Sequence, residues 1–241
     1  MAGKTLDPLR CWSAKIKIAP MTRKLLLGLI LLSIGSRAQA QQVDEDQLGA
    51  WYMYFYNTSF SDSQFGWQGD AQFRFWNFGS DLEQILIRNG LTFQPKDSGI
   101  KFTLGYASIT SGVPGEISET SHENRIYQEA LFSNKIGSRF LLTHRFRYEQ
   151  RWVADQDLRT RYRYMLFLNI PFNKAVLVKG AIYLALYNEI FINGQRDIGN
   201  GRSVEIFDRN RTYLGLGYGL SDRLRVQLGW MNQTTDAWAK G

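Results

Sequence analysis

The stretch between residues 140 and 172 constrains the fold most, because two consecutive segments repeat one alternating pattern. Charged residues occupy alternate positions over 145–151 and again over 159–163, and most residues on the opposite face of each segment are apolar or aromatic. The charged positions are Arg145, Arg147, Glu149, Arg151, Arg159, Arg161 and Arg163. Successive side chains of a β-strand point to opposite faces, so each segment has one charged and one apolar face. A helix would spread these arginines around its circumference, and we therefore predict two strands.

The first forty residues have the features of an export signal. Arg23 and Lys24 precede an apolar run over residues 25–34, and Ala38 and Ala40 supply the small residues of a cleavage site. The apolar run is too short for a membrane-spanning helix, which needs about 20 residues. We predict an N-terminal extension plus a cleavable signal peptide over residues 1–40, with Met21 as an alternative start, and one domain over residues 41–241.

Removal of residues 1–40 changes the charge balance. The whole chain has a formal net charge of +7, from 29 basic and 22 acidic residues. Seven of the basic residues and one of the acidic residues precede residue 41, so the predicted mature domain is nearly neutral. The basic balance of the whole chain therefore does not indicate a nucleic-acid partner. The single cysteine, Cys11, is also removed, so we expect no disulfide in the domain.

The predicted domain is a series of strand patterns without an amphipathic helix. Turn-forming residues separate predicted strands near residues 48–57, 65–77, 82–94, 100–110, 122–132, 139–152, 159–171, 175–192, 207–220 and 223–233. These are longer than the usual five or six residues and match tilted membrane-crossing strands of about 9–11. Short turns alternate with longer breaks near residues 110–121 and 193–205, as at two barrel rims facing different compartments. We predict an all-β, up-and-down antiparallel transmembrane β-barrel of about 10–12 strands.

Alternation alone also fits a soluble sandwich or a lipocalin-like barrel, so the outward face needs further evidence. After residue 40 the chain has 16 arginines and only six lysines. This bias is the reverse of that expected for charged faces whose role is to keep a protein soluble. Arginine suits packed ion-pair networks, because its planar fork binds carboxylates through two nitrogens. Tyr and Trp concentrate towards predicted strand ends, as in membrane-barrel girdles. We predict that the apolar faces contact outer-membrane lipids.

The charged faces then line the barrel interior. The predicted interior charge network comprises Arg125, Glu129, Arg145, Arg147, Glu149, Arg151, Arg159, Arg161, Arg163, Glu189, Arg209 and Arg211. The same alternation also places Arg74, Arg88, Arg225, Asp70 and Glu123 inside. One interpretation is a salt-bridge plug, because confined charges must be paired or hydrated. The other is a narrow, porin-like pore for small anionic solutes, lined by Arg145, Arg147, Arg159, Arg161 and Arg163 and narrowed by Glu149 and Glu189.

Several short motifs occur in a recognisable order: residues 122–129, 145–151, 188–191, 207–213 and 228–233. Together they resemble an uncharacterised family of Gram-negative outer-membrane β-barrel proteins, a domain of unknown function. The resemblance extends from about Leu48 to Gln233. It implies an outer-membrane location and a barrel, but no activity, cofactor or catalytic residue. Family members continue beyond the position of Gly241 into another strand with an aromatic end, so we predict that the C-terminal closing strand is missing here.

The sequence gives little support for catalysis. The two histidines, His122 and His144, lack the spacing of a metal site, and no serine motif accompanies His144. The alternating Gly215, Gly217 and Gly219 do not form a phosphate-binding loop and instead predict room for bulky interior side chains. We therefore predict a protein that is not an enzyme, without cofactor or metal. The alternatives are a lipid-modifying enzyme, in which His144 faces the lipid, and a binding or structural protein that uses the loop over residues 193–205.

Overall fold

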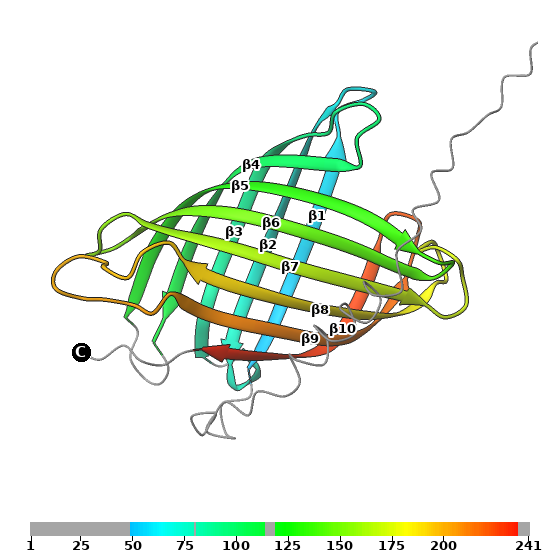
Figure 1. Cartoon of the computed structure of the whole chain (residues 1–241). Helices are drawn as coiled ribbons and strands as arrows, with labels where there is room; N and C mark the ends of the chain where they lie inside the picture. The colour runs from blue at the N-terminus through cyan, green and yellow to red at the C-terminus, as the bar shows by residue number, and fades with distance from the viewer. Residues whose placement is uncertain (1–48, 80, 114–118, 236–241) are drawn as a thin grey trace, which may run out of the picture. The chain divides into compact units, whose positions relative to one another are not determined.

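The described part of the computed structural model, residues 49–79, 81–113 and 119–235, forms one antiparallel sheet of ten strands in chain order (Figure 1). The strands are β1 (Ala50–Ser59), β2 (Phe65–Trp76), β3 (Asp81–Phe93), β4 (Ile100–Gly112), β5 (Thr120–Ile136), β6 (Phe140–Val153), β7 (Arg159–Pro171), β8 (Ile182–Asn193), β9 (Phe207–Gly219) and β10 (Arg225–Thr235). A short 3-10 turn, η2 (Asn77–Gly79), follows β2. The all-β, up-and-down prediction is confirmed. The predicted signal peptide lies outside the described residues. Within them, no helix is long and apolar enough to cross a membrane.

The sheet curls, and its charged face is concave. Gln68 on β2 donates a hydrogen bond to Glu129 on β5, with 2.9 Å between Nε2 and Oε1. Further along the same face, Arg161 on β7 donates a hydrogen bond to Asp208 on β9, with 2.9 Å between Nη1 and Oδ2. Strands that are not neighbours in the sheet can exchange such contacts only across a concave surface. Figure 1 shows the resulting barrel-like curvature.

The two outermost strands leave the described sheet open. The strand order begins with β1 and ends with β10, and no pairing between them closes it. We call this gap the seam. A contact reaches across it on the concave side: the Trp51 ring of β1 lies 5.0 Å from the Arg211 guanidinium carbon of β9. The curl therefore brings the first and ninth strands within side-chain reach.

The strand predicted near residues 175–192 is too long at its start. β8 begins only at Ile182, and the preceding residues form a connection in which Gly180 has φ of 76°. The Asn173 side chain holds this connection by donating to the Gly180 carbonyl and accepting from the Ile182 amide. Val176 and Val178 are thus not strand residues. Alternating apolar residues also occur in irregular backbone, and sequence spacing does not distinguish the two.

The expected separation of short turns and longer connections between two rims holds only in part. The two connections predicted to be longer, β4–β5 and β8–β9, lie at the same end of the sheet. The connection over residues 172–181 follows β7, and the one over residues 194–206 follows β8. Successive connections in an up-and-down sheet lie at opposite ends, so both ends carry a long connection. The room-making role predicted for three glycines is confirmed for Gly215 and Gly217, whereas a Cβ atom at Gly219 would meet the Val178 carbonyl group instead of a bulky side chain. A Cβ atom at Gly217 would collide with the ring of Tyr183, and one at Gly215 would collide with Tyr213.

Candidate functional site: an arginine–carboxylate network

The centre of the concave face is the Glu149 side chain on β6, of which 1% is exposed. Its two carboxylate oxygens accept hydrogen bonds from Arg161 at 2.7 Å and from Arg163 at 2.5 Å. Arg125 and Arg147 each place a guanidinium nitrogen 3.8 Å from the same carboxylate. The alternation along β5, β6 and β7 produces this arrangement, because pairing brings same-face residues of neighbouring strands together. The Glu149 carboxylate thus lies within ion-pair distance of four arginines.

The pairing continues beyond Glu149 as a closed circuit of alternating charge. Glu189 on β8 accepts from Arg163 and Arg145, each at 2.6 Å. Arg145 also lies 3.6 Å from Glu129, which accepts from Arg147 at 2.5 Å. Arg147 returns to Glu149. The circuit therefore runs through Glu149, Arg163, Glu189, Arg145, Glu129 and Arg147.

Two further carboxylates extend the circuit towards the same end of the sheet. Glu123 on β5 accepts two hydrogen bonds from Arg125 and two from Arg151. Asp208 on β9 accepts from Arg161 at 2.9 Å and from Arg209 at 3.0 Å. We call the connected set the charge network: Glu123, Arg125, Glu129, Arg145, Arg147, Glu149, Arg151, Arg161, Arg163, Glu189, Asp208 and Arg209. It joins five consecutive strands, from β5 to β9.

The burial of this network makes its members depend on one another. Each isolated charge removed from water would cost several kcal/mol, and only close, well-oriented partners offset that cost. The bidentate contacts of Glu123 with Arg125 and Arg151 have the geometry in which a guanidinium binds a carboxylate most strongly. Removal of one carboxylate would take a counter-charge from two or more arginines at once. The arrangement can rigidify the sheet and fill its concave side.

The structure brings the predicted network residues together, except for Arg159 and Arg211. Arg159 donates to the side chains of Gln156 and Asn193 and forms no ion pair within the described residues. Arg211 donates to Gln233 and likewise lacks an ion pair there. Arg225, predicted to lie inside, is exposed at the end of β10, where it contacts the Leu177 carbonyl oxygen at 3.4 Å. Alternation predicts the face of the sheet on which a side chain lies. It does not predict how far that side chain is buried, which also depends on its position along the strand.

Asp208 is a network residue that the sequence pattern missed. Counting by twos from Arg209 places it on the apolar face. The register between β8 and β9 shifts at Phe191/Ile192, where Asp208 lies, and the carboxylate reaches Arg161 on the concave side. A β-bulge locally breaks the period of two. No residue in this segment signals the bulge in advance. Two other residues predicted to lie inside, Asp70 and Arg88, form an ion pair of their own at 2.8 Å.

Arg74 and Arg211 form a second, different region, which we call the seam arginines. The Arg74 guanidinium carbon lies 3.8 Å from the centre of the Trp51 ring, and that of Arg211 lies 5.0 Å from it. Arg74 donates to the side-chain oxygens of Gln84 and Gln72. In the described part of the chain, neither arginine has a carboxylate within ion-pair distance. Arg211 also lies 4.8 Å from the centre of the Phe191 ring, which Arg161, Arg163 and Arg209 of the charge network approach as well. Amides and two aromatic rings therefore surround these two cations.

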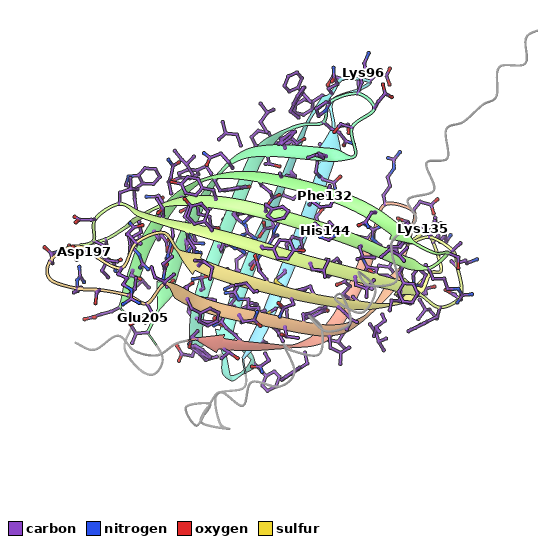
Figure 2. The ribbon with its side chains drawn as sticks, in the orientation of Figure 1. Lys96, Phe132, Lys135, His144, Asp197 and Glu205 are labelled. Carbon is purple, nitrogen blue, oxygen red and sulfur yellow. The ribbon has the colours of Figure 1, made fainter. Side chains whose placement is uncertain are left out.

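The convex face is apolar and exposed. Leu228, for example, is 85% exposed. His144 lies on this face, where its ring stacks on Phe132 with 4.4 Å between ring centres and its Nδ1 lies 2.9 Å from the Tyr164 hydroxyl. Figure 2 shows Phe132 and His144 side by side on the outside of the sheet. These contacts are those of an aromatic surface cluster.

The apolar surface forms a band whose border shifts from strand to strand. On β4 the border lies between Tyr106 and Ser108, and on β10 it lies between Trp230 and Asn232. In the strand register, however, Asn232 is aligned with Ile100, at the far end of the apolar run of β4. The aligned residues between them are Thr212, Asn188, Leu166, His144 and Phe132. Barrel strands tilt and are staggered, so a band of constant height crosses them with such a shift.

Comparison with known proteins places the chain in a family. The model of the family described as "Protein of unknown function (DUF2490)" matches residues 48–241. The chain belongs to this family. An uncharacterised protein of Methylorubrum extorquens is similar to it, with 31% identity over 229 residues that cover 91% of this chain and 92% of that protein. No solved structure matches the chain. The DUF2490 match confirms the resemblance to an uncharacterised family, and neither match names an activity.

Proposed function

We propose that this chain is an integral outer-membrane β-barrel protein whose lumen is filled by the charge network, and that the network is a structural plug. The observation that carries the proposal is the contrast between the two faces of one sheet. The concave face holds buried, mutually paired charges, whereas the convex face exposes apolar side chains. A soluble protein rarely exposes so extensive an apolar surface. We infer that this apolar convex face contacts membrane lipid.

The shifting border of the apolar band supports the same environment. A patch for a protein partner needs no relation to strand tilt. A lipid bilayer, in contrast, requires an apolar band of constant height around the barrel, about 25 Å tall in outer-membrane proteins. The displacement of the border from Ser108 on β4 to Asn232 on β10 is the displacement that tilted strands require. Membrane lipids are thus the partners that the proposal names.

The seam has to be closed in lipid, because unpaired backbone amides and carbonyls are costly there. β1 and β10 carry such groups along their free edges in the described sheet. The proposal therefore includes closure of the seam, for which direct pairing of β1 with β10 is the simplest arrangement. Direct pairing keeps ten strands, an even number as in bacterial barrels.

The plug is favoured over an anion-selective pore by the state of the arginines expected to line the pore. Arg145, Arg161 and Arg163 each bind a carboxylate at hydrogen-bonding distance, so they are neutralised locally. An excess of arginine over carboxylate on the concave face favours the pore as the second candidate. The proposal assigns no catalytic step and no cofactor. His144, the residue of the lipid-modifying alternative, is occupied by Phe132 and Tyr164.

Membrane insertion tests the location. The refolded full chain is mixed with lipid vesicles and then floated through a density gradient, with and without a high-salt wash. We expect the protein to float with the vesicles after the wash and to run faster on a gel before heating than after it. Recovery of folded protein in the soluble fraction without detergent or lipid would contradict the proposal.

A further inference from the structure

Neither of the seam arginines has a carboxylate at ion-pair distance among the described residues, and the charges of Glu83 and Glu189 act on them only from further away. Arg74 is 5% exposed and Arg211 is 8% exposed, so water screens neither well. Both approach the Trp51 ring, Arg74 from β2 and Arg211 from β9, and their positive charges therefore lie close together. Two buried cations near each other are unfavourable without a counter-charge. The aromatic ring attracts them, but its quadrupole replaces a negative charge only weakly.

Hydrogen-bond donors are also left over at this place. Both terminal nitrogens of Arg74 donate to glutamine oxygens, at 2.9 Å to Gln84 and at 2.6 Å to Gln72. Its Nε is buried without a hydrogen-bond partner. Arg211 donates through Nε to Gln233 at 2.6 Å, while its terminal nitrogens have no acceptor among the described residues. Buried donors are normally satisfied, so the Arg74 Nε points to an acceptor that is not a protein group, and the terminal nitrogens of Arg211 are available to the same acceptor.

The one acidic side chain beside Trp51 in the described part of the chain is engaged elsewhere. The carboxylate of Glu83 accepts a hydrogen bond from the Trp51 indole nitrogen at 2.6 Å. It orients the ring through this hydrogen bond and forms no ion pair with either seam arginine in the described chain, although its charge still favours the Arg74 cation.

We propose that Arg74 and Arg211 bind a small oxyanion, a carboxylate or phosphate group, next to Trp51 on the concave side of the seam. A guanidinium fork matches two oxygens of such a group, and Arg74 Nε and the terminal nitrogens of Arg211 supply the free donors. The bound anion provides the missing counter-charge. This site lies outside the charge network and does not depend on the membrane location proposed above.

The test uses the refolded full chain in an uncharged detergent. The thermal unfolding midpoint is measured in sodium phosphate, sodium acetate and sodium chloride at equal pH and ionic strength. We expect phosphate or acetate to raise the midpoint in a saturable way above its value in chloride, because a ligand that binds only the folded state stabilises it. The more effective of the two salts identifies the oxyanion class. Equal midpoints in all three salts would overturn the proposal.

Two variants make the test specific to the site. Arg211→Gln should weaken the apparent oxyanion affinity at least tenfold, while Arg211→Lys, which keeps the charge without the fork, should retain part of the effect. Arg159→Gln is the matched control, because Arg159 is another concave-face arginine without an ion pair in the described chain, but it does not contact Trp51. Loss of the salt-specific shift in Arg159→Gln, or its retention in Arg211→Gln, would contradict the assignment. Line broadening of the phosphate ³¹P resonance by wild-type protein provides a second readout.

Discussion

The charge network and the seam arginines are made of the same residue type on the same concave face, yet their surroundings differ. In the network, every carboxylate contacts at least two arginines, and Glu149 contacts four. At the seam, Arg74 and Arg211 contact amides and Trp51. The comparison teaches that a buried arginine stabilises a fold only when its counter-charge is built in. Where the counter-charge is absent, the same side chain costs stability and becomes available to a ligand.

The largest effect is expected at the centre of the network. Glu149→Gln keeps the shape of the side chain but removes the charge that four arginines share. We expect a loss of about 3–5 kcal/mol in the free energy of unfolding, because buried cations are left uncompensated. Urea unfolding in detergent measures it. Glu205→Gln is the control: Glu205 pairs with Arg196 on an exposed loop, and such pairs contribute about 0–1 kcal/mol. Equal stability of the two variants would show that the network is not structural.

A smaller loss is expected at the edge of the network. Asp208→Asn removes a carboxylate that binds Arg161 and Arg209, but Arg161 retains Glu149 and the Arg209 side chain is more open to water. We expect a loss of about 1–2 kcal/mol by the same unfolding measurement, below that of Glu149→Gln, because fewer and better-hydrated cations lose a partner. A loss as large as that of Glu149→Gln would mean that the network has no centre.

The smallest expected change in stability is at the seam arginines, and its sign is opposite to that expected in the charge network. In chloride, Arg211→Gln should change the free energy of unfolding by no more than about 1 kcal/mol, and in the stabilising direction, since it removes a buried charge without an ion pair. Arg161→Gln, the matched network substitution, should destabilise the protein by about 3 kcal/mol or more. If the two variants lose the same stability, the distinction between the regions fails.

Alternation predicted the strands and the face of most charged residues, because period two is a local property of extended backbone. It identified Glu129, Glu149 and Glu189 as partners of the arginines that now surround them. It missed Asp208, because a register shift re-aims that side chain, and it extended β8 into the connection before Ile182. The contact between Trp51 and Arg211 could not be predicted from alternation either, because it depends on the curvature of the whole sheet.

The central claim is that the charge network closes the lumen, and ion conductance tests it most directly. The refolded protein is inserted into a planar lipid bilayer, with insertion verified independently by vesicle flotation. The account predicts no steady conductance for the wild type. Arg161→Gln combined with Arg163→Gln, which opens the pairing around Glu149, should give intermittent current, whereas the loop variant Arg196→Gln should remain silent. A discrete, anion-selective conductance of the wild type that falls when Arg161 and Arg163 are neutralised would contradict the plug and identify a pore.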